Sequence, residues 1–338
     1  MNPEITLVTL MSLLRSALWG TPLEAPYLEC IRGLDEDGWS ALLEAAQQQT
    51  VSGLLYQAAE RFPEDITLSE AHIMQLMESV NKVVNRNHLL ASVEEEAMVL
   101  LHAGGLHPLV LKGSTCAARY PAPELRASGD IDLYLPEAEF PVAVELLRVS
   151  GYPGSDRPDG SVELAIQGCT VELHRRYYDL DAPAEALPPV PSPEAELVML
   201  SSHILKHACG VGVGLRQICD FALAWHQFTG DRAALEEHFQ RLGLGRWNRL
   251  LLSFIQSYLD PSVKVRPLNP QPLLRIILAG GNFGHYAAAR QQRLERSPLL
   301  RKADTALRLL GRLPFSLRYA PHETWGNLRQ LIQGNLKH

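Results

Sequence analysis

The chain has 338 residues, with 31 Lys and Arg against 38 Asp and Glu, a formal net charge of −7, and 46% hydrophobic residues. This is ordinary globular composition, which excludes collagen-like, intrinsically disordered and mini-protein classes. At about 100–200 residues per domain, the length predicts two domains or one enlarged domain with a sizeable core.

Three sequence features bear on location. No apolar stretch approaches the roughly 20 residues that a membrane span needs, so no transmembrane helix is expected. The first 20 residues carry Glu4 before their apolar run and lack a basic leader, which is typical of an amphipathic helix rather than a signal peptide. The five cysteines are scattered, without a C-x-x-C pair: Cys30, Cys116, Cys169, Cys209 and Cys219. They suit neither a disulfide framework nor a cysteine-based zinc site, so we expect a cytoplasmic protein.

Residues 1–103 have helical periodicity throughout. Trp39–Tyr56 follows this period, and His72–Ala103 predicts one or two longer helices. Gly104-Gly105 ends the last of them, as glycine after a final turn usually does. We expect an N-terminal helical region over residues 1–103.

Residues 104–186 predict a small α/β core. The expected elements are a strand at Pro108–Leu111, a short helix at Thr115–Tyr120, a strand at Ile131–Leu135, a helix at Glu137–Ser150, and a β-hairpin of Val162–Ile166 and Cys169–Leu173. A unit of about 75 residues is too small to be the whole fold.

Four prolines between residues 187 and 193 indicate a stiff connector and a domain boundary. Helical periodicity then returns in Glu194–His207, Leu215–Thr229, Arg232–Leu242 and Arg246–Leu259. We expect a C-terminal helical domain over residues 187–338, and we find no internal repeat.

The strongest chemical signal is a pair of aspartates two residues apart. On a strand that begins at Ile131, the side chains of Asp130 and Asp132 project to the same face. Two carboxylates in this arrangement repel each other unless they are neutralised, and a divalent cation does so by taking hard oxygen ligands. The alternative is a turn that Asp130 caps, with Asp132 solvated.

A second signal is Lys112-Gly113-Ser114, where a strand is predicted to turn into a helix. Free backbone N–H groups and the helix dipole favour phosphate at such a turn. Gly113 would let the phosphate approach the backbone, Ser114 would add a hydroxyl, and Lys112 would add a positive charge. The alternative is a helix start with a serine cap.

A third carboxylate, Glu172, lies on a predicted strand where its apolar neighbours face the core and Glu172 and His174 face the other side. If this strand pairs beside Asp130 and Asp132, three carboxylates converge. That constellation can hold two metal ions that grip a nucleoside triphosphate and activate an acceptor hydroxyl for in-line attack. Taken alone, Glu172 is more typical of a solvated strand residue.

These segments, in this order, resemble the uncharacterised nucleotidyltransferase family of the DNA polymerase β-like superfamily. The resemblance covers roughly residues 101–259 and rests on Lys112-Gly113-Ser114, Leu125–Leu133, Val171–His174, His203–His207 and Leu215–Asp220. It implies an α+β fold, in which a small mixed-sheet nucleotidyltransferase core is flanked by N-terminal and C-terminal helical regions.

Carried over to this chain, the resemblance implies that Asp130 and Asp132 ligate two Mg²⁺ (or Mn²⁺) ions, with Glu172 as the third ligand and a candidate base. The substrate would be a nucleoside triphosphate. Its triphosphate would contact Lys112, Gly113, Ser114 and Arg126.

His203 and His207 lie four residues apart on a predicted helix, which is the spacing of zinc ligands. No glutamate follows His203 and no third ligand is evident, so we do not predict zinc. We expect this helix to face the cleft, with Lys206 or His207 near the nucleotide phosphates; a structural role is the alternative. Arg216 and Asp220, one turn apart, predict a helix-surface pair worth only about 0.3–0.5 kcal/mol.

Residues 281–338 contain ten Lys and Arg against three Asp and Glu, a net charge of +7, so residues 1–280 carry −14. Arginine-rich helices with interleaved aromatic residues suit an anionic partner such as RNA, a lipid surface or an acidic protein. The simpler interpretation, which we prefer, is that these arginines offset the acidic body.

The sequence therefore predicts a metal-dependent nucleotidyltransferase that moves a nucleoside monophosphate to an acceptor hydroxyl and releases pyrophosphate. Two alternatives stay open: an inactive binding or scaffold protein with the same fold, and a glycosyltransferase that holds a sugar nucleotide through Asp-x-Asp. A phosphatase of the Asp-x-Asp-x-Thr type is excluded because Tyr134 stands where threonine is required. The acceptor is a small molecule, a peptide or protein, or an RNA end.

Overall fold

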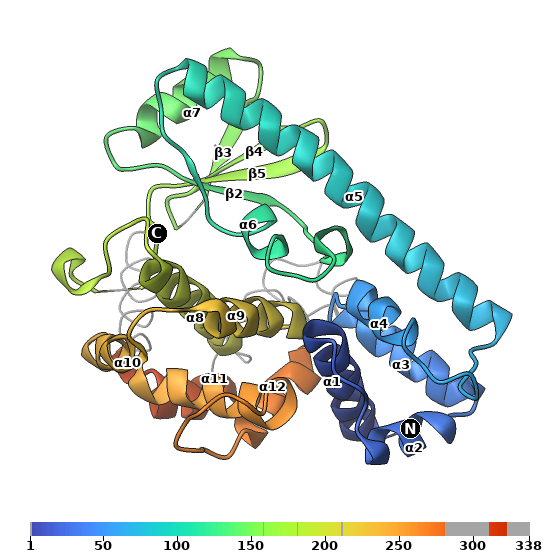
Figure 1. Cartoon of the computed structure of the whole chain (residues 1–338). Coiled ribbons are helices and arrows are strands. Elements are labelled where there is room, and N and C mark those ends of the chain that lie inside the picture. The colour runs from blue at the N-terminus through green and yellow to red at the C-terminus, as the bar shows by residue number, and fades with distance from the viewer. Residues whose placement is uncertain (1, 158, 181, 211, 281–310, 323–338) are drawn as a thin grey trace. The chain divides into compact units, whose positions relative to one another are not determined.

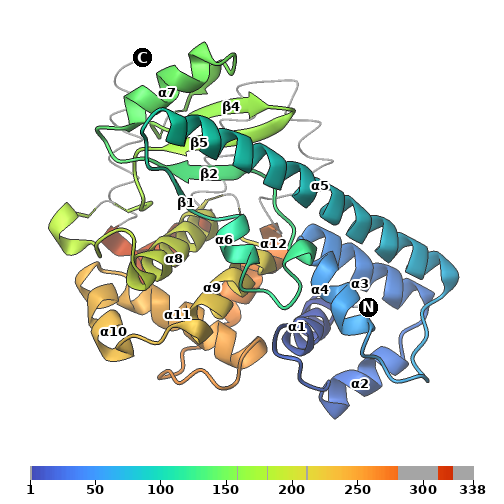
Figure 2. The same cartoon turned by 45° about the horizontal axis from the view of Figure 1, so that its top comes forward.

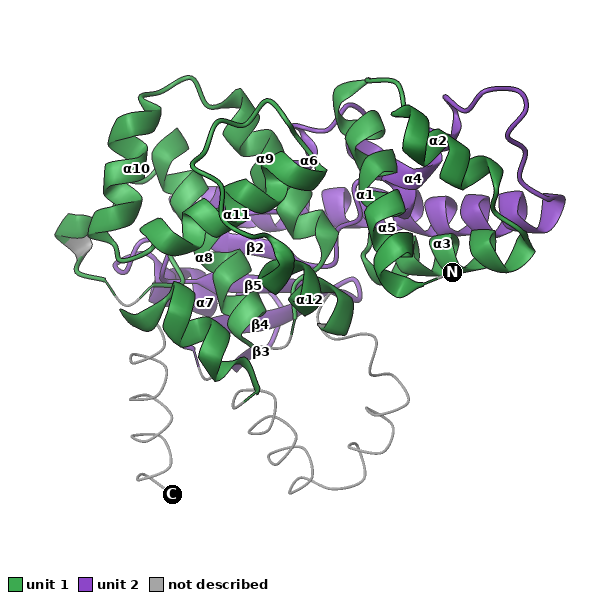
Figure 3. Ribbon diagram, turned by 90° about the horizontal axis from the view of Figure 1, so that it is seen from below, with its two compact units in different colours: residues 1–50, 178–338 green, residues 51–177 purple. Residues whose placement is uncertain are grey.

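The computed structural model describes residues 2–157, 159–180, 182–210, 212–280 and 311–322. The chain forms two compact units (Figure 3): unit 1 comprises residues 1–50 and 178–338, and unit 2 comprises residues 51–177. Unit 2 is therefore an insertion in the sequence of unit 1. The three-part division at residues 103 and 186 stays a prediction.

Unit 1 is helical in its described residues. Its helices are α1 (Pro3–Trp19), α2 (Ala25–Arg32), α3 (Glu36–Gln48), α8 (Pro193–Cys209), α9 (Leu215–Gln227), α10 (Arg232–Arg241), α11 (Gly245–Tyr258) and α12 (Gln271–Gly280), with a 3₁₀ turn η2 (Ala184–Ala186) and a further helical segment at residues 311–319. Side chains cap several of them; the carboxylate of Asp35, for example, accepts from the backbone N–H of Gly38 at the start of α3.

Unit 2 holds the β-sheet (Figures 1 and 2). Its strands are β1 (Leu109–Val110), β2 (Ile131–Tyr134), β3 (Gly154–Asp156), β4 (Val162–Ile166) and β5 (Cys169–His174). They lie in the order β1-β2-β5-β4-β3, and the sheet is mixed because β2 and β5 are parallel while the other neighbours are antiparallel. Its helical elements are α4 (Ser52–Ala59), α5 (Glu70–Ala103), α6 (Ser114–Ala117), η1 (Pro123–Leu125) and α7 (Phe140–Val149).

One face of this sheet packs against α5 and α7 (Figure 2). Alternation along the strands puts Leu133 of β2 and Val171 and Leu173 of β5 in the core, each fully buried. The intervening residues of the same strands therefore lie on the opposite face, which α5 and α7 leave uncovered.

The structure confirms the α+β class and the predicted strands and helices of both units, with boundaries that differ by a few residues. Residues 39–56 form parts of two helices, because Thr50 takes a left-handed conformation (φ 55°) between them. The short strand β3 was not predicted, since Gly154, Ser155 and Asp156 show no apolar alternation.

The sequence predicts neither a membrane-spanning helix nor a disulfide framework. Among the described residues, no helix combines the length and the apolar content that crossing a membrane requires. The five cysteines all lie in the described part of the chain, and none of them forms a disulfide.

Candidate functional site

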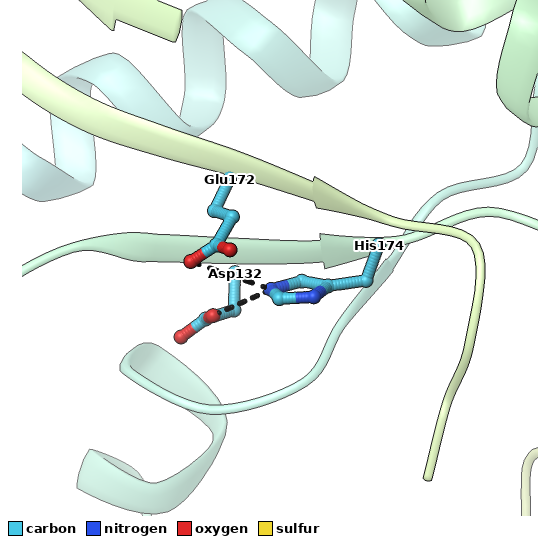
Figure 4. Close-up of side chains that lie close together, drawn as sticks. All are labelled: Asp132, Glu172 and His174. Atoms are coloured by element: carbon cyan, nitrogen blue, oxygen red, sulfur yellow. Dashed lines mark hydrogen bonds and ion pairs between the residues drawn. The ribbon is translucent and has the colours of Figure 1, made fainter. Parts of the chain in front are cut away.

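Three side chains converge on the face of the sheet opposite α5 and α7. The parallel register of β2 and β5 pairs Asp132 with Glu172 and Tyr134 with His174. Because side chains two residues apart share a face, Glu172 and His174 both lie beside Asp132 (Figure 4). One ligand atom from each of Asp132, Glu172 and His174 lies within 4.8 Å of the other two.

Basic and hydroxyl groups surround the two carboxylates. Oδ1 of Asp132 lies 2.8 Å from Nε2 of His174, and its Oδ2 lies 3.2 Å from Nζ of Lys112. The hydroxyl of Ser161 donates to Oε1 of Glu172 at 2.5 Å, while Oε2 lies 3.8 Å from Nε2 of His174. Asp132 is 3% exposed, so these partners stabilise a carboxylate that burial would otherwise disfavour.

Asp130 is not a member of this three-residue group. It lies just before β2 and is exposed, whereas Asp132 is the second residue of the strand and is buried. The structure thus places one of the two predicted aspartates with Glu172, and it adds His174. Alternation predicts that His174 shares the face of Glu172, and histidine is a common metal ligand, so these two signals together could have identified it as a member of the site.

The predicted phosphate turn lies beside the aspartates. Gly113 has φ 70°, a conformation that favours glycine, and a Cβ at this position would lie 3.8 Å from the carbonyl oxygen of Asp130. The hydroxyl of Ser114 donates to Oε1 of Glu94 on α5 at 2.7 Å. Burial raises the pKa of Glu94, and the hydrogen bond from Ser114 partly offsets this rise. No motif in the sequence singles out Glu94.

Arg126 belongs to the loop between η1 and β2. The residue is 5% exposed, and its side chain donates from Nη1 to the hydroxyl of Ser128 at 2.8 Å. The amide of Asn87 on α5 donates to the carbonyl oxygens of both Glu124 and Arg126 at 2.8 Å. Arg126 is therefore held within this loop, and its contact with phosphate stays a prediction.

Lys206 and His207 lie on α8 of unit 1. Nζ of Lys206 lies 2.8 Å from Oδ1 of Asp179, whose Oδ2 lies 3.2 Å from Nδ1 of His203, and Nε2 of His203 lies 3.2 Å from Nε2 of His207. Burial favours the neutral form of Asp179, but hydrogen bonds and charges from His203 and Lys206 outweigh it and hold its pKa well below the usual range. The nucleotide contacts of Lys206 and His207 stay predictions.

One expectation of surface exposure was wrong. Asp220 is 5% exposed, so the predicted pair with Arg216 does not lie on a helix surface: α9 is buried along most of its length.

Of the basic segment 281–338, residues 281–310 and 323–338 lie outside the described part of the chain. Within residues 311–322, Arg312 donates to the carbonyl oxygen of Ala208, and Arg318 lies over the ring of Tyr319.

The carboxylates of Asp132 and Glu172 on adjacent parallel strands, with the imidazole of His174 beside them, form a group that could hold a metal ion. A family model described as "uncharacterised nucleotidyltransferase" matches residues 35–260 of the chain. This match spans more than half of the sequence, and the protein belongs to that family. No curated protein and no solved structure matches the chain.

The donor set fits a divalent metal. Carboxylate oxygens and an imidazole nitrogen are ordinary ligands of such ions, and the atoms that face one another come from two adjacent strands rather than from loops. Lys112 and Ser161 hold the outer oxygens of the two carboxylates, which is how outer partners orient metal ligands.

Proposed function

We propose that this protein is a divalent-metal-dependent nucleotidyltransferase, which moves a nucleoside monophosphate from a nucleoside triphosphate to an acceptor hydroxyl and releases pyrophosphate. The observation that carries the proposal is the parallel register that places Asp132 directly opposite Glu172. The family match supports the nucleotidyl-transfer part of the proposal.

The residues have distinct tasks in this reaction. Asp132 and Glu172 hold the metal, which when bound neutralises negative charge on the triphosphate. Gly113 lets the triphosphate approach the backbone of the turn, and Lys112 adds a positive charge beside Asp132. The acceptor oxygen forms a bond to the α-phosphorus as the bond to the bridging oxygen of the β-phosphate breaks, and Glu172 accepts the hydroxyl proton.

Five further residues are proposed to complete the site. Asp130 is proposed to add a ligand from the start of β2 for a second Mg²⁺ or Mn²⁺ ion. Ser114 and Arg126 are proposed to contact phosphate, and Lys206 and His207 are proposed to bind the nucleotide. The acceptor is a hydroxyl of a small molecule, of a peptide or protein, or of an RNA. The basic segment 281–338 is proposed to offset the acidic body, with binding of an anionic partner as the alternative.

The test is calorimetric titration of the four ribonucleoside triphosphates into the full chain, with Mg²⁺, with Mn²⁺ and with chelator. Asp132→Asn should weaken metal-dependent nucleotide binding by at least about tenfold, because it removes a metal ligand. Asp156→Asn is the matched control, since Asp156 is an exposed aspartate of the same sheet that pairs with Arg148. Equal binding by wild type and Asp132→Asn would overturn the proposal.

A further inference from the structure

The imidazole of His174 lies between the two carboxylates that the proposed function assigns to the metal. Its Nε2 is 2.8 Å from Oδ1 of Asp132 and 3.8 Å from Oε2 of Glu172. Dashed lines in Figure 4 join these two oxygens to His174, while Lys112 and Ser161 engage the other oxygen of each carboxylate. The atoms that this group would offer a metal are therefore two oxygens and one nitrogen.

The position of His174 is fixed by secondary structure. It follows Glu172 by two residues on β5, so both side chains leave the same face of the strand. Its backbone pairs with Tyr134 of β2, and its side chain is 21% exposed. A side chain set by strand register and partly buried keeps Nε2 near the carboxylates without help from a flexible loop.

A donor set of two oxygens and one imidazole nitrogen differs chemically from an all-carboxylate set. Mg²⁺ binds oxygen almost exclusively and keeps several waters. Transition metals such as Mn²⁺ also accept imidazole nitrogen, and their affinity for mixed sites rises along the series that begins with Mn²⁺. A nitrogen ligand at this position would favour Mn²⁺ over Mg²⁺.

We propose that Nε2 of His174 is the third protein ligand of the metal and that it makes the site selective for Mn²⁺ over Mg²⁺. This inference rests on the proposed function, because it assumes that Asp132 and Glu172 hold a metal. It adds a ligand and an ion preference that the carboxylates alone do not give.

A competing role for His174 is that of a hydrogen-bond partner of Asp132. In that case His174 engages Asp132 only until a metal displaces it, and removing the imidazole removes a competitor. The two roles predict opposite effects of His174→Asn on Mn²⁺ affinity: a ligand's loss weakens binding, and a competitor's loss strengthens it or leaves it unchanged.

The experiment titrates Mn²⁺ and, separately, Mg²⁺ into the full chain without nucleotide, using calorimetry. His174→Asn should weaken Mn²⁺ binding by at least about tenfold and should change Mg²⁺ binding by less than about twofold. His107→Asn is the matched control, because His107 also pairs with a carboxylate of unit 2, that of Glu139, at 3.3 Å but lies outside the three-residue group. It should change neither affinity.

Pulsed electron paramagnetic resonance of the Mn²⁺-loaded wild type gives a second readout, which does not depend on a variant that folds. A directly bound imidazole produces nitrogen modulation of the Mn²⁺ signal, and its absence would overturn the assignment of His174. Mn²⁺ binding that survives His174→Asn but is lost in Asp132→Asn would also overturn that assignment while keeping the proposed metal site. Mn²⁺ and Mg²⁺ binding that Asp132→Asn leaves intact, or no binding to wild type, would overturn both.

Discussion

Asp132 depends on the ammonium group of Lys112 because it is a buried carboxylate. Nζ of Lys112 lies 3.2 Å from its Oδ2, and the two side chains are 18% and 4% exposed. Removing one partner of a poorly solvated ion pair leaves the other charge buried. We therefore expect Lys112→Met to lower the free energy of unfolding by about 1–3 kcal/mol.

The measurement is urea unfolding of wild type, Lys112→Met, Asp132→Asn and the double variant. The two losses should be non-additive by at least about 1 kcal/mol, because the second substitution removes the charge that the first one leaves behind. Lys82→Met is the control, since Lys82 pairs with Glu78 on the exposed surface of α5 and should change stability by less than about 0.5 kcal/mol. Strict additivity would contradict the coupling.

A second residue-scale prediction concerns Glu94, whose pKa is raised by burial. The folded protein holds this proton to a higher pH than the unfolded chain does, so ionisation at neutral pH costs stability. The cost disappears as the pH falls below the unfolded pKa of about 4.3. Glu94→Gln keeps an acceptor for the hydroxyl of Ser114 and should stabilise the protein at neutral pH, by less than about 1 kcal/mol because Glu94 is only partly buried.

Urea unfolding at about pH 7 and at about pH 4 checks this prediction, since the difference between Glu94→Gln and wild type should shrink as Glu94 becomes protonated. The same comparison in a Ser114→Ala background adds a second check. Ser114→Ala removes the hydrogen bond that lowers the pKa of Glu94, so it should increase the stability gained from Glu94→Gln at neutral pH. A Glu94→Gln variant less stable than wild type at neutral pH would show that the carboxylate is stabilising.

At the scale of elements, the loop between η1 and β2 is held from two helices. Nη2 of Arg86 on α5 donates to the carbonyl oxygen of Gly129 at 3.0 Å, close to Asp130. On the other side, α4 approaches η1 at Gly53, where an added Cβ would lie 2.1 Å from the carbonyl oxygen of Leu125. The position of the loop before β2 thus depends on a close backbone contact.

Gly53→Ala should therefore displace η1 or α4 and lower the free energy of unfolding by about 1–3 kcal/mol, as overpacking does. Gly129→Ala is the matched control, because a Cβ there meets nothing within 4 Å and its φ is not left-handed. Chemical denaturation of both variants gives the comparison. Similar stability of the two variants would contradict the close packing of α4 against η1.

Strand alternation and strand register explain how much of the site could be predicted from the sequence. Alternation identified β2 and β5 and put Glu172 and His174 on one face, because side-chain period is a local property. Spacing could not separate Asp130 from Asp132, which share a face in any strand that includes both. Their difference in burial arises because the strand begins at Ile131 and pairs in register with β5, and register depends on residues 40 positions away.

Across the whole chain, unit 1 is formed by two stretches, residues 1–50 and 178–338, that flank unit 2 in the sequence. Periodicity predicted the helices of residues 1–50 and of residues 193–258, but it carries no information about which distant helices pack together. The side chain of Gln49 shows the connection: its Oε1 accepts from the N–H of Leu215 at 2.9 Å, and its Nε2 donates to the carbonyl oxygen of Ile277 at 3.4 Å. Gln49 is fully buried.

The hydrogen bonds of Gln49 should therefore stabilise unit 1. Gln49→Ala leaves the buried N–H of Leu215 without its side-chain acceptor at the start of α9, which should cost about 1–3 kcal/mol. Gln48→Ala is the matched control, since the amide of the neighbouring Gln48 donates to Glu44 on the exposed side of α3 at 2.8 Å. It should cost less than about 0.5 kcal/mol.

Thermal unfolding of the two glutamine variants measures the effect on stability. Mn²⁺ titration at a temperature where both variants are folded then tests whether the effect reaches the metal site. The contacts of Gln49 given above all lie within unit 1, whereas Asp132, Glu172 and His174 lie within unit 2. Gln49→Ala should therefore lower the melting temperature and leave the Mn²⁺ affinity unchanged. Equal melting temperatures for the two variants would contradict a structural role for Gln49. A fall in the Mn²⁺ affinity of Gln49→Ala would contradict the expectation that its effect stays within unit 1.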